Sequence, residues 1–290
     1  MNAAATPMNV SIKNAIQEAT QTLRDAGVSE PRREAGSLLA HVLGGDRSFV
    51  LTHGDDILAH PHSQTFRTLL TRRAQGEPVQ YLTGHQEFFK LDFDVSPAVL
   101  IPRPETELIV EAALELTRDD PAPVIGDIGT GSGCIAISLL HELPAAVAVA
   151  TDISRAALDV ARQNAERHSV LGRLTLVESD CFSEVRVAEP FSLITSNPPY
   201  VSDDELRRVQ REVRFEPHFA LAGGPDGLAV IQRLLVDARP FLRSGGHLVF
   251  EIGFGQSDAV ELLIDPRVWK LLEIRKDLQG IPRTFVLQGR

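Results

Sequence analysis

The sequence predicts a small N-terminal all-α domain followed by a doubly wound α/β domain with a seven-stranded, mostly parallel sheet. Three observations support this fold class. The chain has 290 residues, which is long for a single hydrophobic core. Apolar residues recur at helical spacing up to about residue 85. After about residue 104, strand-like and helical segments alternate, which is typical of a parallel sheet with helices on both faces.

The first 85 residues are expected to form a small helical bundle. One helical face carries Ile12, Ile16, Ala19, Leu23 and Ala26. Gly27 follows where a C-terminal cap belongs. Ser29 is expected to cap the next helix, which has Pro31 in its first turn and ends near Gly44. A third helix is expected around Phe66, before the break "QGEP".

A β-hairpin is expected to join the two domains. The stretch "EFFKLDFDV" alternates in polarity, so we assign residues 86–103 to a hairpin linker and residues 104–290 to the α/β domain, whose first helix begins with Pro104. Strands are expected at about residues 124–128, 147–152, 174–178, 191–196, 247–252, 269–276 and 283–288. The last two have no helix between them, so the final strand is expected to run antiparallel.

Composition and net charge limit which cellular location and which binding partners are expected for this protein. The net charge is −10, and residues 1–85 hold eight basic and eight acidic side chains, so the whole acidic excess lies in residues 86–290. This charge weighs against a nucleic-acid substrate. No apolar run approaches the roughly 20 residues of a membrane helix, no signal-peptide pattern opens the chain, and the two cysteines are not spaced as metal ligands. We therefore expect a cytoplasmic protein without a metal site or membrane contact.

A glycine-rich loop follows the first strand of the α/β domain, in "VIGDIGTGSGCIAISLL". The loop consists of Gly129, Thr130, Gly131, Ser132 and Gly133. Its glycines let the backbone turn sharply and approach a ligand, although a plain tight turn would have the same pattern. The third glycine comes one residue earlier than in the dinucleotide fingerprint, and Asp127 precedes the loop. An acid there favours a ligand with an amino-acid tail over a pyrophosphate.

Polar residues end the next three strands as well. Asp152 ends the second strand, where a carboxylate can accept both ribose hydroxyls of an adenosine. It could instead cap the following helix, but Ser154 is better placed to do so. Asp180 ends the third strand and could accept the adenine amino group, with Phe182 packing nearby, or be a solvated turn residue. Because ligands bind at the carboxyl ends of such strands, the pattern predicts bound S-adenosylmethionine.

The stretch "TSNPPY" closes the fourth strand of this domain. Asn-Pro and Pro-Pro often mark plain turns, yet the two prolines also hold the local carbonyls rigid. The Asn197 side-chain oxygen and the Pro198 carbonyl could each accept one N–H of a substrate nitrogen, which would turn its lone pair toward the methyl group of S-adenosylmethionine. Pro199 would keep the loop rigid, and Tyr200 would pack against the substrate group and exclude water. Asn197 is expected to contact both cofactor and substrate.

The sequence resembles a known family at these motifs. "NPPY" is similar to the motif of methyltransferases that modify planar amino groups. Together with "YLTGHQEFFKLDFDVSPAVLIPRPETELIV", "DIGTGSGCIAISLL" and "ALAGGPDGLAVIQRLL", it resembles the peptide chain release factor N5-glutamine methyltransferases. The resemblance covers most of residues 78–290. It implies a class I, Rossmann-like methyltransferase that uses S-adenosylmethionine, releases S-adenosylhomocysteine and modifies the Gly-Gly-Gln glutamine of class-1 release factors in translation termination.

One residue departs from the pattern, and one alternative function stays open. Family members often carry an aromatic residue directly after the acid of the third strand, whereas this chain has Cys181 there and Phe182 next. The adenine could therefore stack on Phe182, or Cys181 could be an ordinary small buried residue. The same motif also occurs in nucleic-acid amino methyltransferases that act on adenine N6 or guanine N2. We expect a monomer in which residues 1–85 dock the release factor.

Overall fold

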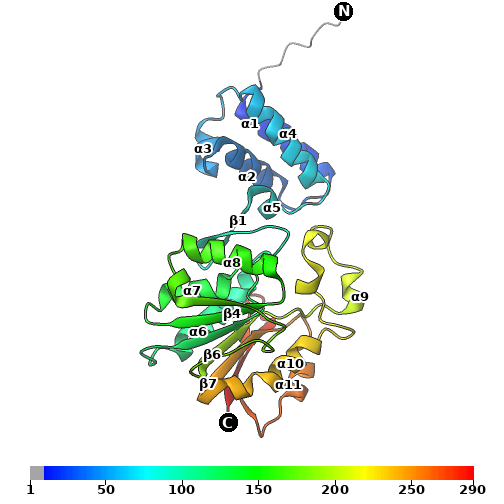
Figure 1. The fold of residues 1–290 in the computed structure, drawn as a ribbon. Coiled ribbons are helices and arrows are strands. Elements are labelled where there is room, and N and C mark those ends of the chain that lie inside the picture. Colours follow the sequence, from blue (N-terminus) through cyan, green and yellow to red (C-terminus); the bar gives the residue numbers. More distant parts are fainter. Residues whose placement is uncertain (1–9) are drawn as a thin grey trace, which may run out of the picture. The chain divides into compact units, whose positions relative to one another are not determined.

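The computed structural model describes residues 10–290, which form two compact units (Figure 1). The described part of the first unit comprises residues 10–84 together with Arg211–Phe215, and the second unit comprises His85–Gln210 and Glu216–Arg290. The predicted hairpin therefore belongs to the same unit as the sheet. Residues 1–9 of the expected helical domain, and with them most of the segment considered as a signal peptide, lie outside the described residues. None of the helices among residues 10–290 is long and apolar enough to cross a membrane.

The described part of the first unit is helical, as predicted. Its helices are α1 (Ile12–Asp25), α2 (Pro31–Leu43), α3 (Arg47–Thr52), α4 (His60–Ala74) and α5 (Val79–Thr83), and a short 3-10 turn, η3 (Val213–Phe215), lies in its second segment. Leu23, Leu38 and Phe66 are buried in one apolar cluster, which confirms the expected helical faces. The sequence does not predict α3 and α5, because a helix of five or six residues is too short to establish an apolar period.

The helix ends agree with the sequence in two places and differ in one. Gly27 and Gly44 have φ values of 79° and 65°, the left-handed conformation of glycine at a helix end. Ser29 does not cap α2, so that prediction is wrong. Glu30 occupies the N-cap position, because Pro31 is itself the first helical residue and the cap must immediately precede it.

The segment Arg211–Phe215 joins the helical unit through a buried cation. Arg73 of α4 is 4% exposed and pairs with Glu34 of α2 and, at 3.0 Å, with Glu212. Arg211 also donates to the Ala74 carbonyl at 2.8 Å. A buried guanidinium requires such partners, since an unpaired one would be strongly destabilising. The sequence does not predict this association, because residues 73 and 212 are 139 positions apart.

The second unit contains a hairpin and a seven-stranded sheet. The hairpin strands are β1 (His85–Phe88) and β2 (Leu91–Asp94). The sheet strands are β3 (Val124–Ile128), β4 (Val147–Asp152), β5 (Leu174–Glu178), β6 (Phe191–Ser196), β7 (Leu242–Glu251), β8 (Trp269–Lys276) and β9 (Pro282–Gly289). Their order is β5-β4-β3-β6-β7-β9-β8. Strands β3 to β7 are parallel, and β9 runs antiparallel to β7 and β8, which confirms the predicted fold class.

Two element boundaries in this unit differ from the prediction. β7 begins at Leu242 rather than near residue 247, because the strand continues through Gly245 and Gly246 with a shifted register against β6. The helix expected at Pro104 starts with a 3-10 turn, η1 (Pro104–Thr106), before α6 (Glu107–Leu116). The other helical elements are α7 (Cys134–Glu142), α8 (Arg155–Arg167), η2 (Leu171–Arg173), α9 (Asp203–Leu206), η4 (His218–Ala220), α10 (Ala229–Asp237), η5 (Arg239–Phe241) and α11 (Ser257–Leu263).

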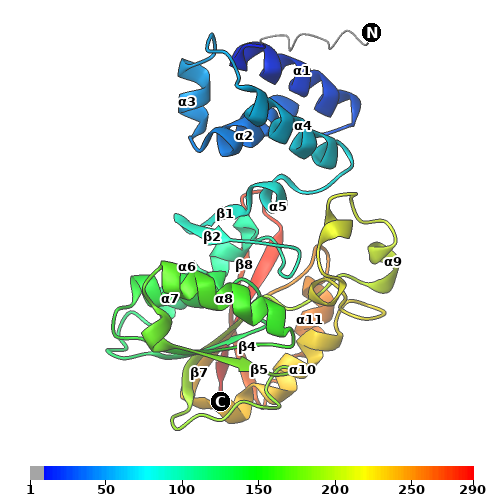
Figure 2. The same ribbon diagram turned by 45° about the horizontal axis from the view of Figure 1, so that its top comes forward.

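Helices cover both faces of the sheet. Figure 2 shows α6, α7 and α8 on one side and α10 and α11 on the other. Neighbouring strand residues belong to opposite apolar clusters: Leu193 packs with α6 and α7, and Ile194 packs with α10 and α11. This alternation follows from the two-residue period of a strand. Because strands β3 to β7 are parallel, the loops that follow them lie at the same edge of the sheet.

Candidate active site

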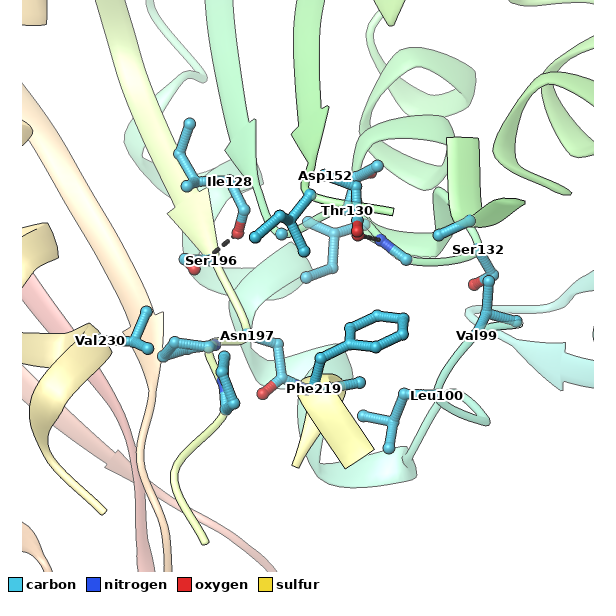
Figure 3. A pocket seen from close by; sticks show the side chains of 18 of the residues that line it. Val99, Leu100, Ile128, Thr130, Ser132, Asp152, Ser196, Asn197, Phe219 and Val230 are labelled. Atoms are coloured by element: carbon cyan, nitrogen blue, oxygen red, sulfur yellow. Dashed lines mark hydrogen bonds between the residues drawn. The ribbon is translucent and has the colours of Figure 1, made fainter. Parts of the chain in front are cut away.

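A cavity of about 300 Å³ opens at the carboxyl edge of the sheet (Figure 3). Most of the predicted site residues line it: Gly129, Thr130, Gly131, Ser132, Asp152, Asp180, Cys181, Asn197, Pro198 and Pro199. Gly133, Phe182 and Tyr200 do not line it. Parallel strands bring the ends of β3, β4, β5 and β6 to one place, so segments far apart in the sequence share one binding surface.

The glycines of the loop after β3 differ in how much free space surrounds them. Gly129 and Gly131 have φ values of 75° and 56°, and a Cβ at either position would meet no atom within 4 Å. They therefore leave open space beside the backbone on the cavity wall. A Cβ on Gly133 would lie 2.7 Å from Ile137 Cδ1 and 3.2 Å from Ala161 Cβ. Gly133 thus allows α7 and α8 to approach closely, and its role is packing.

Asp152 ends β4 and faces the cavity (Figure 3). One carboxylate oxygen accepts from the Gly131 N–H and the other from the Ser154 N–H, both at 2.9 Å. Ser154 accepts from the Ala157 N–H and caps α8, as predicted. Burial raises the pKa of Asp152, and the backbone N–H donors oppose that shift. Asp152 therefore fixes the glycine loop as well as lining the cavity.

Asp127 lies beneath the glycine loop rather than in the cavity wall. It is fully buried and accepts hydrogen bonds from the Thr130 hydroxyl at 2.6 Å and the Thr195 hydroxyl at 2.8 Å. Burial raises its pKa to about 6, although both hydroxyls favour the charged form. The sequence suggested an acid beside the ligand tail; the structure places it one layer deeper, where it holds the loop to β6.

The residues after β5 are divided between the cavity and the core. Asp180 lines the cavity and pairs with Arg233 of α10 at 2.9 Å. Cys181, with φ of 51°, also lines it. Phe182 is 5% exposed and stacks on Phe241 with the ring centroids 4.8 Å apart. The structure thus brings Asp180 and Cys181 to the cavity and keeps Phe182 in the core, where its ring packs in the same apolar cluster as Phe241 of η5 and the buried face of α10.

The loop after β6 presents one unpartnered acceptor. Asn197 donates from Nδ2 to the Thr106 hydroxyl at 3.0 Å, whereas its Oδ1 is buried and accepts no hydrogen bond from the described part of the chain. Pro198 is buried and lines the cavity with Pro199. Such a buried acceptor is costly unless something else donates to it, so it is suited to a ligand N–H.

Tyr200 is directed away from the cavity, contrary to the expected stacking on the amide. Its hydroxyl donates to Glu251 at 2.9 Å, and burial raises its pKa well above the ordinary value. The glycines of "GGPDG" pack on its backbone: a Cβ on Gly227 would lie 2.3 Å from the Tyr200 carbonyl oxygen, and one on Gly223 would lie 2.8 Å from the Tyr200 Cα. Gln256 also donates to that carbonyl at 2.9 Å. Tyr200 therefore anchors the end of the loop.

Several residues of the site are not predicted by the sequence. Phe219 of η4 is 44% exposed and is the aromatic side chain that lines the cavity, with Val99 and Leu100 nearby (Figure 3). In the sequence, Phe219 can be recognised as an aromatic residue a few positions before the motif "GGPDG". Glu251 was also missed, although it ends the apolar run of β7 as Asp152 ends β4. Glu251 could therefore have been predicted in the same way as Asp152, as an acid at the carboxyl end of a strand.

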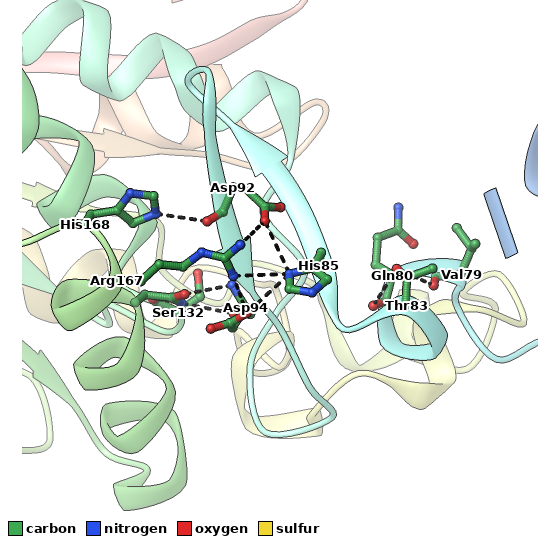
Figure 4. A network of polar contacts seen from close by, with 10 residues as sticks. Val79, Gln80, Thr83, His85, Asp92, Asp94, Ser132, Arg167 and His168 are labelled. Carbon is green, nitrogen blue, oxygen red and sulfur yellow. Dashed lines mark hydrogen bonds and ion pairs between the residues drawn. The ribbon is translucent and has the colours of Figure 1, made fainter. Parts of the chain in front are cut away.

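The hairpin is held to α8 by a polar network (Figure 4). Arg167 donates to Asp94 at 2.7 Å and to Asp92 at 2.5 Å. The buried Asn164 donates to the Asp94 carbonyl at 3.0 Å and to the Ser132 carbonyl in the glycine loop at 2.9 Å. The hairpin is thereby connected to the cavity wall as well as to the sheet unit.

A mostly parallel sheet of this order, with a glycine loop after β3 and an acid ending β4, is the architecture of a Rossmann-like methyltransferase. A family model of the methyltransferase small domain matches residues 106–214, and one of the PrmC N-terminal domain matches residues 14–84. The ribosomal protein L11 methylase of Lactobacillus delbrueckii subsp. bulgaricus has the same fold, with a TM-score of 0.50 and 19% identity over 71% of this chain and 90% of that chain.

Two curated relatives define the family more closely. The release factor glutamine methyltransferase of Koribacter versatilis is 41% identical, with 96% of this chain and 98% of that protein covered. The enzyme of the same name from Moorella thermoacetica is 42% identical, with 97% and 99% covered. The chain belongs to the family of release factor glutamine methyltransferases.

Proposed function

We propose that this protein transfers a methyl group from S-adenosylmethionine to the side-chain amide nitrogen of the glutamine in the Gly-Gly-Gln motif of class-1 peptide chain release factors. The observation that carries this proposal is the Asn197 side chain. Its Oδ1 is a buried acceptor without a partner in the described chain, beside a cavity whose other walls suit an adenosine with an amino-acid tail. A glutamine amide offers the N–H donors that this acceptor lacks.

The cavity residues fit the cofactor. Gly129 and Gly131 leave open space at the loop backbone, and Asp152 presents a carboxylate at the end of β4 for the ribose hydroxyls. Asp180 and Cys181 line the part of the wall assigned to the adenine. The cavity volume of about 300 Å³ lies at the lower end of the range for small-molecule sites. When bound, S-adenosylmethionine supplies an electrophilic methyl group on its sulfonium and leaves as S-adenosylhomocysteine, and the methylated amide nitrogen, which is strongly acidic, releases its extra proton to water.

The chain's own contribution is to position the amide. Its nitrogen is a poor nucleophile because the lone pair is conjugated into the carbonyl. Asn197 Oδ1 and the Pro198 carbonyl would each accept one N–H, which fixes the NH₂ group and its lone pair. Correct positioning is worth effective molarities of roughly 10⁵–10⁸ M in favourable cases. The rings of Pro198 and Pro199 limit backbone motion, and Phe219 supplies an apolar surface that excludes water from the amide.

The direct test is incubation with labelled S-adenosylmethionine and a class-1 release factor, with tRNA, rRNA and DNA as competitors. We expect label only in the release factor, and mass spectrometry should locate one methyl group on the Gly-Gly-Gln glutamine. Transfer to a nucleic acid in preference to the protein would replace this proposal by the amino-methyltransferase alternative.

We also propose that residues 1–85 dock the release factor, while residues 86–103 link them to the methyltransferase domain of residues 104–290. A glutamine loop alone offers little surface, whereas stable interfaces bury roughly 1,200–2,000 Å². The helical unit has its own core and exposes Phe49, Leu51 and Ile57, with Leu51 70% exposed. Exposed apolar side chains of this kind are suited to a protein partner.

Surface substitutions test this docking role. We expect Leu51→Ser combined with Ile57→Ser to lower methylation of intact release factor without changing cofactor affinity or methylation of a short Gly-Gly-Gln peptide. Leu262→Ser, at an 88% exposed leucine of α11, is the matched control and should change none of these. An equal loss of activity on protein and peptide would contradict the docking role.

The protein is proposed to act as a monomer in the cytoplasm, where translation termination takes place. A net charge of −10 favours self-repulsion between copies. Sedimentation equilibrium should give a mass near 31.7 kDa, and a dimer at micromolar concentration would contradict this expectation.

A further inference from the structure

A buried carboxylate organises the residues behind the Asn-Pro-Pro-Tyr loop. Glu251 ends β7 and is 1% exposed. Its Oε2 accepts from the Thr106 hydroxyl at 2.6 Å, and its Oε1 accepts from the Tyr200 hydroxyl at 2.9 Å. Thr106, which is 2% exposed, in turn lies 3.0 Å from Asn197 Nδ2. The chain of contacts therefore runs from Glu251 through Thr106 to the amide at the cavity.

The chemistry of these groups fixes the direction of each hydrogen bond. An ionised carboxylate only accepts, so both hydroxyls must donate to it. Thr106 has a single hydroxyl proton, and once that proton points to Glu251 the oxygen can only accept from Asn197. The NH₂ of Asn197 must then face Thr106, and its Oδ1 must face the cavity.

The opposite orientation of the amide would be penalised on both sides. A flipped Asn197 would place its oxygen against the Thr106 oxygen, which has no proton left to donate. Its NH₂ would then face the substrate NH₂, donor against donor. A buried polar group left without a partner is destabilising enough to depopulate that orientation at least about tenfold. Burial raises the pKa of Glu251, while the Thr106 and Tyr200 hydroxyls stabilise its carboxylate form.

We propose that Glu251 and Thr106 are positioning residues for methyl transfer: together they orient the Asn197 amide so that its oxygen faces the substrate nitrogen. This inference rests on the proposed function, since it assigns Asn197 Oδ1 to the acceptor amide. It adds that the orientation is imposed from the end of β7 and from η1, and not by the loop itself. Glu251 does not line the cavity, and Thr106, which does, has its hydroxyl engaged by Glu251 and Asn197. Both should therefore act through Asn197, on turnover more than on cofactor binding.

Three substitutions separate this role from simple packing. Thr106→Val keeps the side-chain shape and removes the hydroxyl, and we expect kcat to fall about 10–100-fold with unchanged cofactor affinity. Thr106→Ser restores the hydroxyl and should recover most of the rate. Glu251→Gln can donate as well as accept, so the direction of the Thr106 hydroxyl is no longer fixed and kcat should also fall at least about tenfold. Thr117→Val is the matched control, because that buried hydroxyl at the end of α6 donates only to the Ala113 carbonyl in its own helix.

A second readout does not depend on turnover. In ¹⁵N spectra of the full-length protein, the side-chain NH₂ signals of Asn197 report its hydrogen bond to Thr106. They should shift in Thr106→Val and return in Thr106→Ser. The proposal is overturned if these signals are unchanged in Thr106→Val, or if Thr106→Val turns over within about twofold of the wild type. It is also overturned if Thr106→Ser is as slow as Thr106→Val. Wild-type protein that leaves the glutamine unmethylated but shows the expected shifts would contradict the proposed function and not the orientation of Asn197.

Discussion

Replacing Gly227 by alanine should disturb the active-site loop from a position that does not line the cavity. Gly227 has φ of 77°, and an added Cβ would lie 2.3 Å from the Tyr200 carbonyl oxygen and 2.6 Å from Gln256 Nε2. Gly255 provides a matched control with the same φ of 77° and no atom within 4 Å of an added Cβ. The two substitutions therefore carry the same backbone strain and differ in the steric clash.

The magnitudes follow from these distances. Alanine in the left-handed region costs roughly 1–2 kcal/mol, and both variants carry this cost. Relieving a 2.3 Å contact to the ordinary separation of about 3.5 Å requires the Tyr200 carbonyl or residue 227 to move by about 1 Å. Overpacking of this kind costs roughly a further 1–3 kcal/mol. A displacement of about 1 Å next to Pro198 and Asn197 could slow the reaction about 100-fold.

The assay combines unfolding and turnover. Trp269 is the single tryptophan and is 2% exposed in the sheet unit, so its fluorescence follows the unfolding of that unit in urea. We expect Gly227→Ala to be less stable than Gly255→Ala and to methylate release factor about 100-fold more slowly, with cofactor affinity close to the wild type. If the two folded variants have the same kcat, the proposed contact between residue 227 and the loop does not position the substrate.

Three further predictions concern the cavity and the layer beneath it. Asn197→Ala should lose roughly 10²–10³ in kcat while calorimetry still detects cofactor binding, and activity within a few-fold of wild type would exclude Asn197 as the acceptor. Asp152→Ala should chiefly weaken cofactor affinity, because each hydrogen bond to a carboxylate is worth roughly 1.5–3 kcal/mol; an unchanged dissociation constant would exclude Asp152 as the ribose ligand. The pKa of Asp127 is raised to about 6 in the folded protein, above its ordinary value near 3.8, so the folded state holds the proton more tightly and stability should decrease as pH rises from about 4 to 6. Asp127→Asn should lack this decrease, so the free energy of unfolding of the variant minus that of the wild type should rise by roughly 2.4 kcal/mol between pH 4 and pH 7. A pH-independent difference would show that Asp127 does not carry the proton.

Local chemistry explains why much of the fold and site could be predicted. Gly129 and Gly131 stand where the backbone needs positive φ, and Asp152 and Asn197 end strands whose apolar runs are visible in the sequence. Once these strands are recognised as parallel, their carboxyl ends must meet at one edge. No knowledge of packing is needed to bring these residues together.

The wrong predictions concern aromatic residues, because several of them could have lined the cavity equally well on sequence grounds. Phe182, Tyr200 and Phe219 are all aromatic residues near a predicted motif, and the sequence does not say which ring faces the cavity. The structure buries Phe182 against Phe241 and directs the Tyr200 hydroxyl to Glu251, so Phe219 remains on the cavity wall. Packing decides among them, because a ring takes the position that buries most apolar area and satisfies its polar atoms.

The sequence by itself determined which functional groups end the strands along the chain. These are a glycine loop, an acid, and a rigid loop that carries an amide. Only the tertiary structure decided which way the Asn197 amide points. Thr106 lies 91 positions away from Asn197 in the sequence, and Glu251 lies 145 positions away from Thr106. Backbone conformation and strand ends are set by neighbouring residues and can be read locally. The direction of a buried hydrogen bond depends on donors and acceptors brought together from distant segments, and so it exists only in the folded chain.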